Sequence, residues 1–226
     1  MSPTYEAVAV LTSGGLDSAI LVADLARQSR RCVPIYINAG LAWESVELEF
    51  LRRYLAEIGK GLPSLEPLVI LEQPVRDLYG DHWSTTGKSV PDAKTPDQAV
   101  YLPGRNLLLV TKALLWCHLH GVKILALGVL ASNPFPDASE RFFALLGETV
   151  CDAVSDPDLR IIRPYGEMHK AEVMKRGEGL PLELSFSCIA PKQGLHCGQC
   201  NKCAERRKAF ADAGMMDPTK YETSFI

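Results

Sequence analysis

Short apolar runs alternate with longer amphipathic stretches over most of this 226-residue chain. This alternation is typical of parallel strands joined by crossover helices, because such strands are buried on both faces and each helix has one apolar face. The predicted strands span residues 7–11, 33–38, 68–71, 123–130 and 159–162. The predicted helices span residues 18–28, 44–58, 106–120 and 140–154. The sequence therefore predicts an α/β fold with a Rossmann-like parallel sheet.

Composition and charge favour a soluble globular protein over a nucleic-acid or membrane binder. With 47% hydrophobic residues, the chain can build a full core, and we expect a soluble globular protein. Its 27 acidic and 24 basic residues are mixed along the chain and give a net charge of −3, which argues against a general nucleic-acid or membrane-surface binder. The apolar run at residues 7–11 follows no basic segment and is too short for a signal peptide or a membrane span. We therefore expect a cytoplasmic protein without nucleic-acid or membrane partners.

The junction of the first predicted strand and helix reads Thr12-Ser13-Gly14-Gly15-Leu16-Asp17-Ser18. At the carboxyl end of a parallel strand, the backbone N–H groups of a tight turn and of the next helix point at one spot and can bind an anion. Adjacent glycines can adopt a positive φ close to phosphate oxygens, and the Ser13 and Ser18 hydroxyls add donors. Asp17 would hold Mg²⁺ or orient the loop. An ordinary strand-to-helix turn capped by Asp17 or Ser18 is the alternative.

The complete segment favours nucleotide binding over a plain turn, because it combines a motif with the strand–turn–helix context that the motif requires. It resembles the signature of the pyrophosphatase-loop family of ATP-dependent adenylating enzymes, and it lacks the Gly-Lys-Ser/Thr of a Walker loop. The resemblance implies that ATP is cleaved between its α- and β-phosphates, with transfer of AMP and release of pyrophosphate. The predicted ATP-binding residues are Thr12, Ser13, Gly14, Gly15, Leu16, Asp17, Ser18 and Ala19.

Four of the seven cysteines gather near the C-terminus, at Cys188, Cys197, Cys200 and Cys203. Two residues between ligands let a thiolate knuckle turn back on one ion, so these four can close a tetrahedral Zn²⁺ site. Four protein ligands leave no open position for water, and the predicted zinc is therefore structural. Buried or reactive thiols and an iron–sulfur cluster are the alternatives. His196 could compete as a ligand, although a place beside the site or on the surface is the preferred interpretation.

Residues 74–99 are rich in Pro, Asp, Gly and Thr and show no clear period. A loop of that length inside a compact domain is usually functional or mobile, so we interpret it as a loop that covers the substrate. Trp43, Trp83 and Phe135 could form an aromatic wall for a planar base, although core or loop anchors are the simpler interpretation of each.

The loop motif and the cysteine pattern together resemble the 7-cyano-7-deazaguanine synthase family. Further segments carry the same resemblance. The segment from Tyr101 to Asn106 resembles that family's Val-Pro-Gly-Arg-Asn, and Pro136-Asp137 resembles its Pro-Asp element. Pro164, followed by Lys170-Ala171-Glu172-Val173, resembles a Pro and Lys-x-Glu-Ile pattern ahead of the cysteines, and Arg206 and residues 213–218 also match the family. The resemblance therefore covers most of the chain at spaced points.

This resemblance implies an ATP-dependent ligase with an adenine nucleotide alpha hydrolase-like fold. The enzyme would convert 7-carboxy-7-deazaguanine and ammonia into 7-cyano-7-deazaguanine on the route to queuosine, through an adenylated carboxylate, an amide and a second activation of the amide oxygen. It would be a homodimer. Residues 1–180 would form the ATP-binding domain, and residues 181–226 a zinc-binding segment packed on it. Asp17, Ser18 and Lys170 would be the catalytic residues.

The same resemblance implies roles for residues outside the loop. Arg105 and Lys170 would lie on phosphate charge, with exposed ion pairs as the alternative. Arg105, Asn106 and Asp137 would bind the substrate, Asp137 through a base edge or Mg²⁺. A helix N-cap at Asn106 and a simple turn at Asp137 are the alternatives.

Two other functions remain as hypotheses. One is another pyrophosphatase-loop enzyme, such as an amide-forming ligase or a tRNA base-modifying thiolase. A thiolase usually has cysteines close to the loop and a basic tRNA surface, which this sequence lacks. The other is a non-enzymatic nucleotide- and zinc-binding module, against which the intact loop motif argues.

Overall fold

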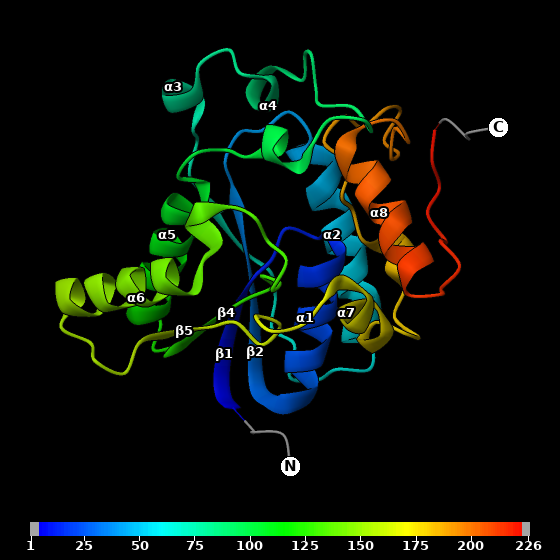
Figure 1. The fold of residues 1–226 in the computed structure, drawn as a ribbon. Helices are drawn as coiled ribbons and strands as arrows, with labels where there is room; N and C mark the ends of the chain where they lie inside the picture. Colours follow the sequence, from blue (N-terminus) through cyan, green and yellow to red (C-terminus); the bar gives the residue numbers. More distant parts are fainter. Residues whose placement is uncertain (1–4, 223–226) are drawn as a thin grey trace.

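A five-stranded parallel sheet lies between two layers of helices in the computed structural model, which describes residues 5–222 (Figure 1). Met1–Thr4, which precede the apolar run judged too short for a signal peptide, lie outside the described residues. The strands are β1 (Tyr5–Leu11), β2 (Ser29–Asn38), β3 (Val69–Glu72), β4 (Ile124–Leu127) and β5 (Arg160–Ile162). The predicted α/β fold with a parallel sheet is confirmed.

In the sheet order β3-β2-β1-β4-β5, the direction in which successive strands are added to the sheet reverses between β1 and β4. The chain winds outward from β1 to β3 and then returns to the other side of β1, where Ala9 pairs with Leu125. In open parallel sheets, ligands bind at such a switch point, outside the carboxyl ends of the strands. The topology therefore predicts the site just beyond Leu11 and Leu127.

Two helical layers bury the two faces of the sheet, as Figure 1 shows. Helices α1 (Leu16–Gln28), α2 (Glu44–Gly59), α7 (Lys170–Arg176) and α8 (Asn201–Asp212) cover one face. Helices α5 (Arg105–Leu119) and α6 (Glu140–Val154) cover the other face. Successive β1 residues alternate between the two cores, with Val8 and Val10 in the first and Ala9 in the second. Burial on both faces explains why the strands read as continuous apolar runs.

Several boundaries differ from the prediction. Strand β4 ends at Leu127 rather than at residue 130, because Gly128 passes close to the first turn of α1. Strand β2 begins at Ser29, four residues before the predicted start at 33. Helices α7 and α8 were not predicted, and residues 74–99 contain two single helical turns, α3 (Arg76–Tyr79) and α4 (Trp83–Thr86).

The C-terminal segment packs on the sheet domain through a buried arginine as well as through apolar side chains. Arg206 is 1% exposed, and its guanidinium donates to Ser185 Oγ at 2.9 Å and to the Leu182 carbonyl at 2.8 Å. Ala209 and Phe210 of α8 join the same core as α1. Within residues 5–222, no helix has the length and apolarity that crossing a membrane requires.

Contact between α1 and α7 leaves no room for a side chain at Gly177. A Cβ atom there would lie 2.7 Å from Ile20 Cδ1 and 3.1 Å from the Met174 carbonyl. We expect Gly177→Ala to lower the free energy of unfolding by about 1–3 kcal/mol, the usual effect of overpacking a core. Urea unfolding measures it.

Gly147→Ala is the matched control, because its Cβ would meet Ile161 Cδ1 at an ordinary 3.8 Å. Inside α6 this change should raise the free energy of unfolding by about 0.5–1 kcal/mol, since Gly is the poorer helix former. Equal stability of the two variants would contradict the packing seen between α1 and α7.

Candidate functional site

The loop between β1 and α1 is held in shape by its own hydroxyls. Ser18 Oγ donates to the Gly15 carbonyl at 3.1 Å and lies 3.3 Å from both Thr12 Oγ1 and the Ser13 amide. Gly14 has φ +78°, so this position requires the freedom of glycine. Gly15 has φ −66°, and the expectation that both glycines use a positive φ is wrong for this one.

Side chains within the predicted ATP-binding segment face in two directions. Leu16 and Ala19 are buried in the core, and the Ala19 amide already donates to the Gly15 carbonyl at 2.9 Å. Of these two residues, Leu16 lines a cavity above the loop and can meet a ligand through its backbone. Ser13 and Asp17 are half-buried and line the cavities above the loop. The start of α1 thus presents its unpaired N–H groups and two polar side chains to one region, as anion binding requires.

Asp17 and Lys170 meet although 153 residues separate them. Lys170 Nζ lies 2.8 Å from both carboxylate oxygens of Asp17. Lys170 is the first residue of α7, and a capping box formed by His169 and Glu172 fixes where this helix begins. Of the three residues expected to be catalytic, the structure brings Asp17 and Lys170 into direct contact and places the Ser18 hydroxyl inside the loop.

Arg105 begins α5 directly after Gly104, which has φ +74°. Its side chain lines the cavities above the loop, and its Nε is buried without a hydrogen-bond partner. A buried donor left unpaired is unfavourable by about 1–3 kcal/mol, so a ligand that accepts from it would be stabilised. Arg105 is therefore placed to bind an anion beside the loop.

Asn106 and Asp137 bind each other. The Asn106 amide donates to Asp137 Oδ2 at 3.1 Å, and its side-chain Nδ2 donates to the Asp137 carbonyl at 3.0 Å. Asp137 is 7% exposed, and burial raises the pKa of its carboxyl. Asp137 thus caps the N-terminus of α5 from another segment, whereas Asn106 lies inside the helix and is not its N-cap.

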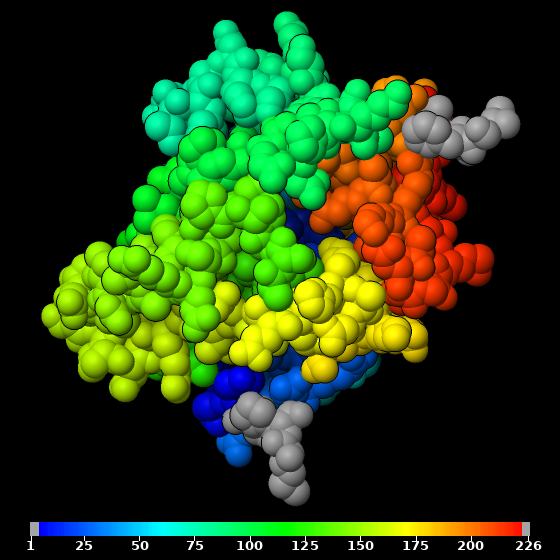
Figure 2. Space-filling model, in the orientation of Figure 1, coloured from blue at the N-terminus to red at the C-terminus, as the bar shows by residue number. Residues whose placement is uncertain are grey.

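Three cavities open around these residues, and one of them, of about 270 Å³, extends from Asp17 and Lys170 to Phe135. The other two lie directly above the loop. The first, of about 200 Å³, lies between the carboxyl ends of β1 and β4, and we call it the sheet cavity. The second, of about 190 Å³, extends toward Phe186 and Arg206 of the C-terminal segment, and we call it the C-terminal cavity. Ser13, Gly15, Asp17, Glu47 and Arg105 line both cavities. Figure 2 shows a hollow between green, yellow and orange segments with the dark blue N-terminal segment at its floor.

Three residues of this site, which are Glu47, Tyr36 and Gly128, were not identified from the sequence. Glu47 is 6% exposed, and its Oε2 accepts a hydrogen bond from the Tyr36 hydroxyl at 2.9 Å. Burial raises the pKa of Glu47 to about 8. A Cβ atom on Gly128 would lie 3.2 Å from the Ser18 amide, so this glycine lets β4 approach the loop. The available signal was a glutamate on the apolar face of α2, three residues before the buried Phe50.

The segment at 74–99 is anchored to the connection between β2 and α2. The Ala42 amide donates to the Ser84 carbonyl at 2.9 Å, and the rings of Trp43 and Trp83 stack at 5.8 Å. Phe135 instead stacks on Tyr101 at 5.0 Å, so the three aromatic residues do not form one wall. Trp43 alone of the three lines the C-terminal cavity.

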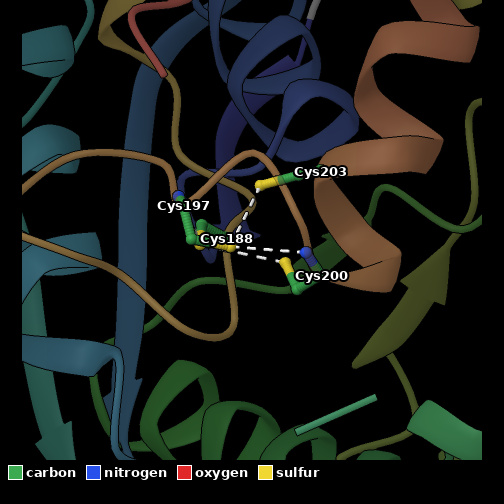
Figure 3. A group of neighbouring side chains, drawn as sticks. All are labelled: Cys188, Cys197, Cys200 and Cys203. Atoms are coloured by element: carbon green, nitrogen blue, oxygen red, sulfur yellow. Dashed lines mark hydrogen bonds between the residues drawn. The ribbon is translucent and has the colours of Figure 1, made fainter. Parts of the chain in front are cut away.

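The four C-terminal cysteines converge on one point (Figure 3). Their Sγ atoms lie within 4.8 Å of one another, and all four residues are buried. The Cys188–Cys200 and Cys197–Cys203 sulfur pairs are 3.8 and 3.9 Å apart. A tetrahedron with metal–sulfur bonds of about 2.3 Å has edges of about 3.8 Å, so the set fits one metal ion. Backbone amides also donate to sulfur, for example from Cys197 and Ala190 to Cys188 Sγ.

His196 lies beside this cluster and is not part of it. It is 1% exposed, which corrects the expectation of a possible surface position. Burial lowers the pKa of its imidazole to about 3, and its Nε2 accepts from the Ser187 amide at 3.2 Å. Of the other three cysteines, Cys32 and Cys117 are buried in the core and Cys151 is half-buried.

Comparisons with known proteins identify relatives of this chain. The family model described as "Queuosine biosynthesis protein QueC" matches residues 6–214. A protein of Thiobacillus denitrificans, named 7-cyano-7-deazaguanine synthase, is 31% identical over 94% of this chain and 96% of its own length. A protein of Sphingopyxis alaskensis, named 7-cyano-7-deazaguanine synthase 1, is 33% identical over 95% of this chain and 97% of its own length.

A solved structure shares the fold. The U34-tRNA thiolase NcsA of Methanococcus maripaludis, solved with its [4Fe-4S] cluster, superposes with a TM-score of 0.53 at 16% identity. The match covers 93% of this chain and 68% of the thiolase chain. At that identity the likeness supports the fold alone, which is the fold expected from the loop motif.

The cysteine cluster predicts that metal content and stability fall together. We expect Cys200→Ser to lose bound metal and to melt at a lower temperature, because metal binding to such a site is coupled to folding. In a domain of this size each kcal/mol lost lowers the melting temperature by about 2–4 °C. Elemental analysis and thermal unfolding on one preparation measure both quantities.

Cys151→Ser is the matched control, since the Cys151 thiol donates to the Leu159 carbonyl and a hydroxyl can do the same. It should keep the metal content of the unchanged protein. A Cys200→Ser protein that holds a full complement of metal would contradict the four-cysteine site.

Proposed function

The chain belongs to the family described as queuosine biosynthesis protein QueC, and we propose that it is an ATP-dependent 7-cyano-7-deazaguanine synthase. Its substrates are 7-carboxy-7-deazaguanine, ammonia and ATP, and its products are the nitrile, AMP and pyrophosphate. The curated relatives that bear this name match nearly the whole chain, so the activity is carried over from proteins of the same length.

The unpaired Arg105 Nε is the observation that supports ATP binding most directly. Arg105 lines both cavities together with the glycine loop, and Lys170, whose Nζ contacts Asp17, lines the C-terminal cavity. Two cations and the N-terminus of α1 therefore surround one point at the sheet's switch position. A polyphosphate would give Arg105 an acceptor and would meet positive partial charge at α1.

Adenylation uses this arrangement in a simple way. A carboxylate oxygen of the substrate attacks the α-phosphorus, and the bond to the β-phosphate breaks. The leaving pyrophosphate stays on the loop amides and on Arg105 and Lys170, which stabilise its developing charge. The Asp17 carboxylate would hold Mg²⁺, which neutralises phosphate charge.

Nitrile formation then needs a second round of the same chemistry. Ammonia displaces AMP from the adenylated carboxylate and leaves an amide. The amide oxygen is adenylated by a second ATP, and loss of AMP with the N–H protons gives the carbon–nitrogen triple bond. Each carboxylate oxygen leaves on one AMP, so two ATP are converted to two AMP and two pyrophosphate for each nitrile.

The metal in this proposal is Zn²⁺ with a structural role. Four buried thiolates match its preferred ligands, and they leave no position for a substrate. From the family resemblance we also propose that the enzyme is a homodimer in the cytoplasm. Light scattering on the purified protein tests the dimer.

The proposed reaction predicts specific products. Incubation with ATP, Mg²⁺, ammonium and 7-carboxy-7-deazaguanine should give 7-cyano-7-deazaguanine and AMP, because the loop directs attack to the α-phosphate. Mass spectrometry identifies both. ADP as the main nucleotide product would overturn the proposal, and a protein that binds ATP without turnover would favour the non-enzymatic module.

Gly14 gives a second test of the loop. Gly14→Ala should lower AMP formation by about 100-fold, the scale of loss that a misplacement of about 1 Å can cause. The new Cβ atom would lie 3.3 Å from Leu51 Cβ, at a φ of +78° that side chains rarely adopt. Gly121→Ala is the control. Gly121 lies in an exposed turn with a similar φ of +68°, and a Cβ atom there would have no neighbour within 4 Å. Equal activity of the two variants, per folded protein, would refute the role of the loop.

A further inference from the structure

Glu47 is an acidic residue of the site for which adenylation provides no role. It lies on α2 and lines the sheet cavity as well as the C-terminal cavity, beside Ser13 and Arg105. Only 6% of its surface is exposed. Burial of a carboxylate is costly unless the group is paired, so its position at the junction of two cavities calls for an explanation.

The other acids at this edge of the sheet are already engaged. Asp17 accepts two bonds from Lys170. The Glu44 carboxylate accepts from the amides of Ala39, Gly40 and Leu41 at 2.7 to 3.0 Å, and it thereby fixes the connection from β2 to α2. Glu47 instead is oriented by the Tyr36 hydroxyl, a neutral partner that leaves the carboxylate able to take up a proton.

The reaction requires a proton acceptor at this place. When ammonia attacks the adenylated carboxylate, its nitrogen acquires a positive charge and must lose a proton before AMP can leave. Asp17 and Glu44 are held by their partners, Glu205 is paired with Lys202, and the cations Arg105 and Lys170 cannot accept a proton. A carboxylate at the junction of the nucleotide region and the second cavity is placed for this task.

Building on the proposed function, we infer that the Glu47 carboxylate is the general base that accepts the proton of the nitrogen nucleophile. The new bond joins nitrogen to the carboxyl carbon, and the bond from that carbon to the AMP oxygen breaks. The proton passes from nitrogen to a Glu47 oxygen, and AMP leaves with the electron pair. Tyr36 is a positioning residue, because it acts through the hydrogen bond to Glu47.

The pH dependence follows from the same surroundings. Burial, with a smaller effect of the Glu44 charge, raises the pKa of Glu47, whereas Arg105 and the hydrogen bonds with Tyr36 and Trp43 lower it, and the net result is a pKa of about 8. Asp17 and Lys170 line the C-terminal cavity with Glu47, as do Lys202, Glu205 and Arg206 of α8. A base must be unprotonated, so the rate of the nitrogen step should rise with pH up to about 8 and level off above it.

The test separates this step from adenylation. Hydroxylamine replaces ammonia as the nucleophile, because it is neutral over this pH range and forms a hydroxamate that ferric ion reveals. Carboxylate-dependent exchange between ATP and pyrophosphate reports adenylation on the same preparations. If the protein without substitutions shows no exchange, the proposed function itself is refuted. If it shows exchange but replacing Glu47 does not change hydroxamate formation, only this inference is refuted.

Glu47→Gln should retain exchange and lower hydroxamate formation by about 10²–10⁴-fold, the usual range for loss of a general base. Its residual rate should no longer rise with pH. Glu49→Gln, an exposed position two residues along the same helix, is the matched control and should behave as the unchanged protein. Loss of exchange and hydroxamate in equal measure, or an unaltered pH profile, would overturn the assignment.

Tyr36→Phe provides a second readout that a structural role would not produce. Removing the hydroxyl takes away a hydrogen bond that lowers the pKa of Glu47, so the midpoint of the pH profile should move to higher pH. Exchange should continue, which shows that the protein is folded and adenylates. A midpoint that stays in place in this variant would contradict a base at Glu47.

Discussion

The close approach of β4 to the first turn of α1 is the constraint on which the site depends. Gly128 brings the end of β4 to where a Cβ atom would lie 3.2 Å from the Ser18 amide. With β1 and β4 adjacent at the switch point of the sheet, the loop amides and the sheet cavity face the same space. Arg105 and Lys170 are then brought to that space by helices on opposite faces of the sheet, which lets cations reach a ligand from both sides.

The C-terminal segment adds a second cavity to the site at the carboxyl edge of the sheet. Phe186 donates its amide to the Gly14 carbonyl at 2.7 Å, and the four cysteines share an apolar cluster with Trp43 and Phe50. These contacts wall the C-terminal cavity, which the proposed function assigns to the second substrate. A metal ion held by the four cysteines would shape this cavity by fixing the backbone, without a coordination position for the chemistry.

Sequence patterns predicted the elements whose signal is local. The glycine loop, the cysteine spacing and helix α6 at Glu140–Val154 were placed correctly because a motif or a hydrophobic period marks each. The seven-residue α7 and the largely polar α8 lack such a period. The capping of α5 by Asp137 depends on a contact between segments 31 residues apart, which no local pattern marks. The place of Glu47 on the apolar face of α2 signals burial, but it gives no sign that the carboxylate reaches a cavity.

The span of 153 residues between Asp17 and Lys170 has a consequence for the order in which the site is made. A nascent chain carries the loop early, but its lysine partner, the Phe186 amide and the cysteines all follow after residue 169. Contacts of such long sequence separation form slowly, because the loop-closure entropy is lost before they stabilise the fold. During synthesis the half-built protein therefore presents β1 and α1 without the cation that binds Asp17, and the site proposed for adenylation is complete only once the last quarter of the chain has left the ribosome.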